Sequence, residues 1–266
     1  VQNLRINGNA VNQTSGTMRG IYLYGARNSK IVDCWVENLR EYGIYLQNSS
    51  SNTVIGNTIQ GNSLDNSNNN TVIGNTCQGN GQHGIYLTAS SNNTVTGNTI
   101  QGNDHHGIYL SSSSDNNMVS TNMVLGNSQA THNTDNGIQV YQSNYNNIQG
   151  NTVRKGTGSK QQNTGITILS GTSNFVANND LYQAGATASF RDTGTGTIFD
   201  YSQSGRAENV VPLKPAGLKE NTISFPISFP SVPRVTANLA NFDNGAAWAY
   251  VVQINTVTPD NFTIIT

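Results

Sequence analysis

Charged residues are scarce in this sequence, and their scarcity excludes several classes of protein. Of the 266 residues, 13 are Lys or Arg and 14 are Asp or Glu, so charged residues make up 10% of the chain and the net charge is −1. A nucleic-acid-binding protein that works by electrostatics needs a basic face, which this composition excludes. The sequence also lacks a run of about 18 apolar residues, which excludes membrane insertion of a helix.

The chain is also unlike a disordered protein, although it is rich in Asn, Ser, Thr and Gly. Disordered chains combine low hydrophobicity with a high net charge, and here the net charge is close to zero. Such a chain must instead fold through regular hydrogen bonds between uncharged polar side chains. Regular bonding of this kind is typical of chains built from internal repeats.

Two phrases recur along the first 200 residues. The phrase Asn-Thr-Val-Ile-Gly-Asn and its degenerate copies end at Asn57, Asn75, Asn98, Asn122, Asn151 and Asn179, in steps of 18, 23, 24, 29 and 28 residues. The phrase Gly-Ile-Tyr-Leu alternates with it and begins at Gly20, Gly43, Gly84 and Gly107, with variants at Gly137 and Gly165. The 18-residue step lacks this second phrase and has Ser63-Leu64-Asp65 in its place.

Both phrases alternate apolar and polar residues, which is the periodicity of a strand. Ile85 and Leu87 are expected to point into the fold, while Tyr86 points outward. Short strands in coils of about 23 residues predict a parallel β-solenoid, in which equivalent residues stack along the axis. The last Asn of each copy should then form a buried ladder of amides.

Cysteine is nearly absent, since Cys34 and Cys77 are the only two. In the stacked coils they fall two coils apart, about 10 Å, in different columns. This exceeds the Cα separation of about 7 Å that a disulfide allows. We expect both to be free, with Cys77 acting as a small buried hydrophobic residue.

Residues 1 to about 200 resemble the right-handed parallel β-helix repeat family through the pattern Gly-Ile-x-Leu…Asn-x-Val-x-Gly-Asn. The resemblance implies the fold but not one activity, because pectin lyases, alginate epimerases, phage tailspikes and cell-surface proteins share it. Val1–Asn9 already match the repeat and no cap helix precedes them. We therefore expect that the chain was cut from a longer protein.

The composition changes after residue 196. Residues 201–218 are predicted to form a linker, and residues 219–266 contain apolar runs separated by prolines. Four runs predict strands: Thr222–Ile227, Arg234–Leu239, Trp248–Ile254 and Phe262–Ile265. The phrases Ile223-Ser-Phe-Pro and Asn255-Thr-Val-Thr…Phe262-Thr-Ile resemble the H-type lectin domain. This resemblance implies a six-stranded antiparallel β-sandwich that forms trimers, as at the tips of phage tail fibres. The predicted fold is all-β: a parallel β-helix followed by a small antiparallel β-sandwich.

A column of tyrosines supplies the candidate carbohydrate-binding residues. The outward residue of each Gly-Ile-x-Leu phrase is Tyr22, Tyr45, Tyr86, Tyr109, Gln139 or Thr167. A Tyr ring can stack on a sugar ring and form hydrogen bonds through its hydroxyl. We name as candidates Tyr42, Tyr45, Tyr86, Tyr109 and Trp248. The alternative is that these tyrosines are strand-forming residues that only pack on one another.

A second column lies just before the Gly and supplies the candidate catalytic residues. His83 and His106 should lie one coil apart, about 5 Å, and Asp135 one coil beyond. Together with Asp104 they could perform the proton abstraction of a polysaccharide lyase or epimerase. The run Asn103-Asp-His-His-Gly-Ile resembles a coil of the alginate C5-epimerases, but the Asp-Pro-His-Glu of that family has no match here. Two carboxylate pairs, Glu37 with Glu41 and Asp104 with Asp135, leave glycosidase chemistry open.

The remaining motifs predict no metal site and no cofactor. Aspartates are scattered over different columns rather than clustered for Ca²⁺, and no nucleophile elbow is present. The leading hypothesis is a carbohydrate-recognising protein of a phage tailspike or tail fibre, or of a cell surface. It would be extracellular and homotrimeric, and it would bind polysaccharide along the β-helix. The alternatives are a polysaccharide lyase, C5-epimerase or glycosidase, and a structural spacer.

Overall fold

The computed structural model describes residues 1–9, 19–39 and 41–199, and three further strands at 220–224, 253–257 and 261–265. The chain divides into two compact units, Val1–Gly205 and Arg206–Thr266. The elements of the described residues are all strands. None of the described residues belongs to a helix long and apolar enough to cross a membrane.

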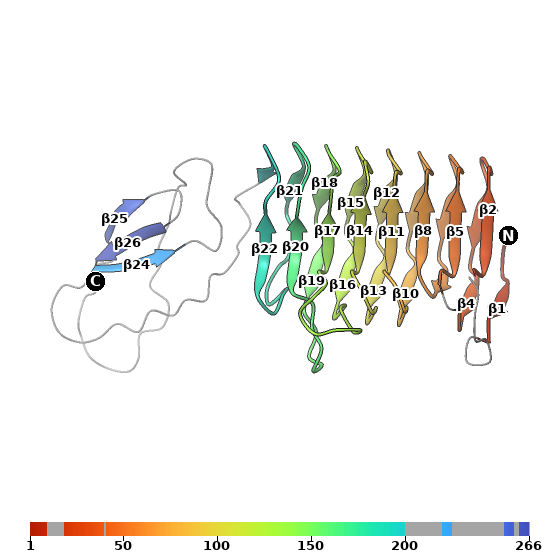
Figure 1. The fold of residues 1–266 in the computed structure, drawn as a ribbon, viewed down its shortest axis with the longest axis horizontal. Coiled ribbons are helices and arrows are strands. Elements are labelled where there is room, and N and C mark those ends of the chain that lie inside the picture. Colours follow the sequence, from red (N-terminus) through yellow and green to blue (C-terminus); the bar gives the residue numbers. More distant parts are fainter. Residues whose placement is uncertain (10–18, 40, 200–219, 225–252, 258–260, 266) are drawn as a thin grey trace. The chain divides into compact units, whose positions relative to one another are not determined.

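The first unit is a stack of coils that forms three parallel sheets (Figure 1). Among the described residues, every coil but the last contributes one strand to each sheet, and the last contributes to sheets 2 and 3. Sheet 1 consists of β1 (Arg5–Asn7), β4 (Trp35–Glu37), β7 (Thr58–Ile59), β10 (Thr76–Gln78), β13 (Thr99–Gln101), β16 (Met123–Leu125) and β19 (Thr152–Arg154). Sheet 2 consists of β2 (Ile21–Tyr24), β5 (Ile44–Gln47), β8 (Asn62–Asp65), β11 (Ile85–Thr88), β14 (Ile108–Ser111), β17 (Ile138–Val140), β20 (Thr164–Ile168) and β22 (Ala188–Asp192).

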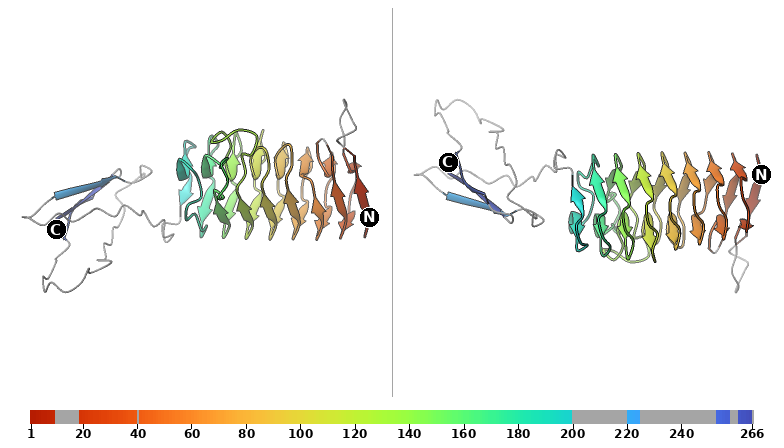
Figure 2. Two further views of the ribbon diagram at one scale, coloured as in Figure 1. Left: turned by 90° about the horizontal axis from the view of Figure 1, so that it is seen from below. Right: turned by 90° about the horizontal axis from the view of Figure 1, so that it is seen from above.

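Sheet 3 closes each coil. It consists of β3 (Lys30–Val32), β6 (Thr53–Ile55), β9 (Thr71–Ile73), β12 (Thr94–Thr96), β15 (Met118–Ser120), β18 (Asn147–Gln149), β21 (Phe175–Ala177) and β23 (Ile198–Phe199). Every strand in the three sheets pairs with its equivalent in the next coil, and the rows of parallel strands are visible from opposite sides in Figure 2. The structure thus confirms the predicted parallel β-helix.

Aliphatic columns fill the interior of the coils, as the alternation predicts. Ile85 pairs in register with Ile108, and Leu87 with Leu110, and all four side chains are completely buried. Val95 and Ile100 are also buried, on β12 and β13. Because each coil presents the same aliphatic residue at the same level, the core continues from one coil to the next.

The predicted amide ladder is present at the turn between sheets 3 and 1. Asn57, Asn75 and Asn98 are each about 1% exposed. The Asn57 Nδ2 donates to Asn75 Oδ1 at 2.9 Å, and the Asn75 Nδ2 donates to Asn98 Oδ1 at 3.0 Å. The same Oδ1 atoms also accept backbone N–H groups of the preceding coil. The ladder continues through Asn122, Asn151 and Asn179.

Further ladders were not predicted from the sequence. The first Asn of each repeated phrase forms a second amide ladder, in which Asn70 Nδ2 donates to Asn93 Oδ1 at 3.2 Å. Its rungs are Asn52, Asn70, Asn93, Asn117, Asn146 and Asn174. A hydroxyl ladder runs through Ser49, Ser67, Ser90, Ser114 and Ser143. These ladders satisfy the buried turns of a chain that has few charges.

The 18-residue coil departs from the aliphatic pattern, and β8 takes the place of a Gly-Ile-Tyr-Leu strand as predicted. Asn62 occupies the core position that Ile44 and Ile85 fill in the neighbouring coils. It is 1% exposed, its Nδ2 donates to Cys77 Sγ at 3.2 Å, and its Oδ1 is buried without a hydrogen-bond partner. This coil therefore places a polar side chain where the neighbouring coils have an aliphatic one.

Both cysteines are free, as predicted, and both are buried. Cys77 lies on β10 between Ile59 and Ile100, so its side chain occupies a position that is aliphatic in adjacent coils. Burial raises the pKa of its thiol to about 12, which keeps the group neutral.

The second unit contains a small antiparallel sheet in the order β24 (Glu220–Ser224), β26 (Asn261–Ile265), β25 (Gln253–Val257). The antiparallel pairing and the strands near 222–224 and 262–265 were predicted. The expected strand Arg234–Leu239 and the candidate residue Trp248 lie outside the described residues. So do the parts of the predicted β-sandwich that would form its second sheet.

Candidate carbohydrate-binding face

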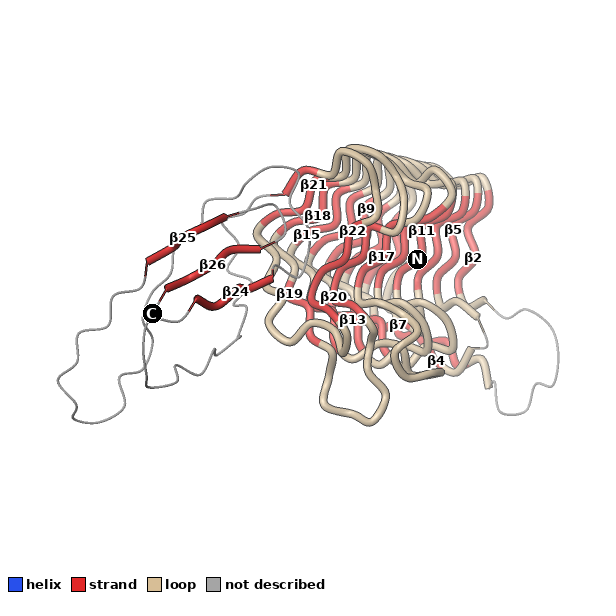
Figure 3. Tube along the Cα trace, turned by 60° about the vertical axis from the view of Figure 1, so that its left-hand side comes forward, coloured by secondary structure: helices blue, strands red, loops and turns tan. Residues whose placement is uncertain are grey.

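The outer face of sheet 2 carries the predicted tyrosine column. Tyr22 lies in register with Tyr45, and Tyr86 lies in register with Tyr109, while Ser63 interrupts the column at the short coil. Figure 3 shows the strands of sheet 2 side by side along the solenoid, with loops and turns at both ends of the strands. The column continues as Gln139 and Thr167. The predicted register is therefore confirmed.

The prediction that every residue of this column faces solvent is wrong. Tyr45 is 7% exposed, whereas Tyr22 is 45% exposed. The Arg19 guanidinium lies 3.9 Å from the centre of the Tyr45 ring, and the Tyr22 and Tyr42 rings lie 5.4 and 5.9 Å away. These groups cover Tyr45, so its ring face is not available to a sugar in this arrangement. Gln139 and Thr167 are also buried, at 8% and 2% exposed.

A hydrogen bond to Asp65 holds the Tyr45 hydroxyl in place. Tyr45 OH donates to Asp65 Oδ2 at 2.7 Å, and Gln47 Nε2 donates to the same oxygen at 3.0 Å. Burial, and then the hydrogen bond to Asp65, raise the pKa of Tyr45 well above its usual range. Burial raises the pKa of Tyr42 to about 12. Both phenols therefore stay neutral at physiological pH.

A second aromatic group lies on β11, β14 and the turns before them, and combines the two sets of predicted residues. We call His83, His106, Tyr86 and Tyr109 the Tyr–His cluster. Tyr86 and Tyr109 stack at 5.2 Å with 11° between their planes, and His83 and His106 stack at 5.2 Å with 4° between theirs. The His83 ring also lies 5.0 Å from the Tyr109 ring. Two of the candidate binding residues and two of the candidate catalytic residues are thus in contact with one another.

The two histidines have a structural role that was not predicted from the sequence. His83 Nδ1 accepts the backbone N–H of His106 at 3.2 Å, and His106 Nδ1 accepts the backbone N–H of Asn136 at 2.8 Å. One coil further, Asn136 Oδ1 accepts the backbone N–H of Thr164 at 3.0 Å. The histidines are therefore rungs of an acceptor ladder, in the place of asparagine. This bonding assigns the ring proton of each neutral histidine to Nε2.

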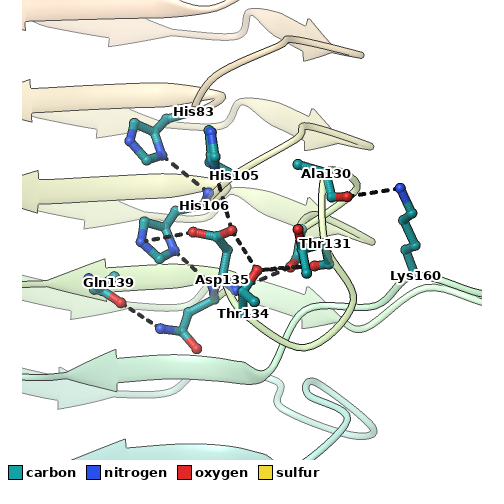
Figure 4. A network of polar contacts seen from close by, with 11 residues as sticks. His83, His105, His106, Ala130, Thr131, Thr134, Asp135, Gln139 and Lys160 are labelled. Carbon is teal, nitrogen blue, oxygen red and sulfur yellow. Dashed lines mark hydrogen bonds and ion pairs between the residues drawn. The ribbon is translucent and has the colours of Figure 1, made fainter.

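The carboxylate of Asp135 lies next to the cluster (Figure 4). Its Oδ1 is 3.3 Å from His106 Nε2 and its Oδ2 is 3.3 Å from His105 Nδ1. Thr134 Oγ1 also donates to Oδ2 at 3.0 Å. The predicted proximity of His106 and Asp135 is therefore present. His105 precedes His106 in the same turn and was not among the candidate site residues. Its position next to His106 in the sequence could have indicated it.

Asp104 is a different case, because none of its contacts is with the Tyr–His cluster in the part of the chain that the structure describes. Its backbone N–H donates to Asn80 O at 2.8 Å, and its carbonyl accepts from Ala130. The structure brings together His83, His106 and Asp135, but not Asp104.

This geometry limits what His83 and His106 can do chemically. Burial lowers the pKa of His83 to about 3 and that of His106 to about 4, while the Asp135 charge partly opposes the shift at His106. At neutral pH both rings are uncharged, with Nδ1 occupied and a hydrogen on Nε2. A general base needs a free lone pair, which neither ring offers. The rings can instead donate hydrogen bonds from Nε2.

The histidine ladder predicts acid sensitivity. The folded pKa values lie below the ordinary value of 6.5, so the unfolded chain binds more protons as the pH falls from 6.5 to 4. The free energy of unfolding should therefore fall as the pH is lowered through that range, by up to about 1.4 kcal/mol per pH unit for each histidine.

A matched variant isolates this effect. The double substitution His83→Asn and His106→Asn keeps an acceptor at each rung, as Asn136 does, but cannot be protonated. Thermal unfolding midpoints of both proteins should be measured from pH 7 to pH 4. We expect the midpoint of the parent chain to fall more steeply. Parallel curves would show that the histidines do not titrate as the ladder requires.

Comparison with solved structures shows that the fold is a known one. The periplasmic alginate epimerase AlgG has a TM-score of 0.51 and 18% identity, covering 68% of this chain and 47% of that chain. DFA-IIIase from Arthrobacter chlorophenolicus A6 in complex with GF2 has a TM-score of 0.53 and 17% identity, covering 69% and 51%. The enzymatically active domain of bacteriophage CBA120 tailspike protein 2 has a TM-score of 0.50 and 14% identity, covering 79% and 36%. The chain spans about half or less of these structures.

Two family profiles match this chain. No curated protein is similar enough in sequence to count as a match. The profile of the H-type lectin domain matches residues 220–266, in agreement with the predicted resemblance. A second profile matches residues 1–132 and 118–201, the whole of the β-helix. Over that range the chain belongs to the family described as periplasmic copper-binding protein (NosD).

Proposed function

We propose that this chain is a carbohydrate-binding protein that holds a glycan against the outer face of sheet 2, at the Tyr–His cluster. The observation that carries the proposal is the partly exposed, stacked pair Tyr86 and Tyr109, backed by two neutral histidines. Stacked aromatic rings bordered by hydrogen-bond groups suit sugar rings, which have apolar faces and hydroxyl edges. Tyr109 is bonded to Gln139 and Ser111, so its ring is held in place.

A double substitution tests the proposal. If each ring stacks on a sugar, Tyr86→Ala with Tyr109→Ala should weaken binding by a few kcal/mol, since base stacking on aromatic rings is worth about 1–3 kcal/mol each by analogy. Retention should be measured on a panel of capsular, teichoic and plant polysaccharides. Tyr145→Ala is the control, because that ring is 60% exposed and lies outside sheet 2. Equal retention of the parent and the double variant would contradict the proposal.

We also propose that the protein acts outside the cytoplasm, as part of a phage tailspike, a tail fibre or a cell surface, and that it forms trimers. The support is the order of the two family matches, a β-helix followed by an H-type lectin domain. The family description names the periplasm, and one similar structure is a phage tailspike. Light scattering should give a trimer mass for the full chain and a monomer mass after deletion of residues 216–266. A trimer that survives the deletion would refute this role.

Copper is named in the family description, but the described residues do not fit it. No group of three or more His, Cys, Asp or Glu that could hold a metal is found among residues 1–9, 19–39, 41–199 and the three C-terminal strands. The Nδ1 atoms of His83 and His106 already accept backbone hydrogens, and the His106 Nε2 faces Asp135. Cys34 and Cys77 are buried in separate coils. We therefore propose no role for copper at this face.

A second candidate function is glycan modification, favoured by the pairing of His105 with Asp135. The contact of Asp135 Oδ2 with His105 Nδ1 orients the ring and leaves its Nε2 as a candidate base, which His83 and His106 do not provide. Incubation with the same polysaccharides should then yield new reducing ends or unsaturated products. His105→Ala should abolish product without abolishing retention. Retention without product in the parent chain would exclude this candidate.

A further inference from the structure

We infer that the glycan bound at the Tyr–His cluster is uncharged, and that this face rejects polyuronates and other polyanions. The inference rests on the proposed function and adds the chemical class of the ligand. It depends on how charges are distributed along the solenoid, on how those charges are already bonded, and on the state of the histidines.

Cations are absent from the coils that carry the cluster. From Tyr42 to Val153 the sequence contains no Lys and no Arg, whereas it contains Asp65, Asp104, Asp115 and Asp135. All of these residues are described by the structure. A polyanion lying on Tyr86 and Tyr109 would therefore meet carboxylates without a compensating cation. Like charges at short range disfavour binding, and more so where water is displaced.

Two of the cations outside this stretch, one before it and one after it, are already engaged. Arg19 lies over the Tyr45 ring and pairs with Glu41 at 3.5 Å. Lys160 Nζ donates to Ala130 O at 2.9 Å, on the loop beyond Asp135 (Figure 4). Recruiting either group to an anionic sugar would cost the contacts that it now makes.

The histidines supply no positive charge either. The Nδ1 atoms of His83 and His106 accept backbone hydrogens, so protonation would break a rung of the ladder. Their lowered pKa values agree with this bonding. His105 faces Asp135, so any charge on its ring would be neutralised by that carboxylate.

Two of the carboxylates, Asp135 and Asp65, are likewise already bonded. Asp135 already accepts from Thr134 and faces two histidines. Asp65, which is in register with Thr88 of β11, already accepts from Tyr45 and Gln47. An ammonium group would compete with these donors. The neutral ring of His83 has its Nε2–H to offer a sugar hydroxyl, while the Tyr86 hydroxyl already accepts from Ser111 and that of Tyr109 is bonded to Gln139 and Ser111.

Affinity electrophoresis with matched polymers tests the inference. The gels contain highly methyl-esterified pectin, the same pectin after de-esterification, glycol chitosan, or N-acetylated glycol chitosan, at pH 7 and low ionic strength. In at least one pair the uncharged polymer should retard the protein, with an apparent Kd at least tenfold lower than that of its charged counterpart. Tyr86→Ala with Tyr109→Ala should remove that retardation. A Thr88→Lys variant should gain retardation by de-esterified pectin, because it places a cation beside Tyr86.

The outcomes separate this inference from the proposed function. Stronger retardation by de-esterified pectin or by glycol chitosan, lost in the double tyrosine variant, would overturn the uncharged ligand but keep the binding site. Retardation by an uncharged polymer that persists in the double variant would refute the site itself. Absence of retardation by all four polymers would count against both. Failure of Thr88→Lys to gain binding would show that charge does not control access to this face.

Discussion

Replacing Asn98 by Ala should lower the free energy of unfolding by about 4 kcal/mol, because four buried hydrogen-bonding groups lose a partner at once. The Oδ1 of Asn98 accepts the backbone N–H of Asn75 at 2.9 Å and the Asn75 side-chain amide at 3.0 Å. Its Nδ2 donates to Val72 O at 3.0 Å and to Asn122 Oδ1 at 2.9 Å. Water cannot replace these bonds easily, since Asn98 is 1% exposed.

Gln101→Ala is the matched control. It also removes an amide pair between adjacent coils, because Gln101 Nε2 donates to Gln78 Oε1 at 2.8 Å, but this pair lies at the surface. We expect it to change the free energy of unfolding by less than about 0.5 kcal/mol. Both variants should be unfolded in denaturant beside the parent chain. Similar losses in the two variants would show that burial of the ladder is not what stabilises it.

Replacing Gly107 by Ala should cost about 3 kcal/mol and should also displace the candidate binding face. A Cβ at Gly107 would lie 2.5 Å from Val124 Cγ1 and 2.6 Å from the carbonyl oxygen of Gly137 in the next coil. These distances are too short for any real contact, and the backbone atom cannot rotate away. The coils must separate at the start of β14, which carries Tyr109.

Gly102→Ala distinguishes this crowding from ordinary backbone strain. Gly102 has φ +61°, but a Cβ there would meet nothing within 4 Å. The expected cost is only the left-handed conformation of Ala, about 1 kcal/mol. Unfolding in denaturant should rank Gly107→Ala well below Gly102→Ala in stability. Only Gly107→Ala should also weaken glycan retention. The reverse order would contradict the close approach of adjacent coils at this glycine.

Features that repeat in every coil could be predicted from the sequence. The inward aliphatic residues and the Asn57 ladder were predicted because the same residue recurs at the same step, and identical residues then stack. The short coil was also located correctly, with Ser63 in the place of a tyrosine. The second ladder through Asn52 was missed, although the same spacing applies to it, because that Asn was treated only as the start of a phrase.

Features that depend on neighbours from other coils could not be predicted. Tyr45 is buried because Arg19, from the preceding coil, lies over its ring. The acceptor role of His106 depends on which ring atom faces Asn136, and spacing alone does not determine a side-chain torsion. Asp104 and His105 are adjacent in the same turn, and only the path of the backbone decides which of them meets Asp135.

The amide ladder has a direction, and that direction bears on how the chain folds during synthesis. The backbone N–H groups of Cys34, Asn57 and Asn75 are accepted by side chains that belong to the following coil. The chain leaves the ribosome from its N-terminus. The turn of each coil therefore lacks acceptors for its backbone N–H groups until the next coil has been made. Assembly should advance one coil behind synthesis, with the last coil made always the loosest.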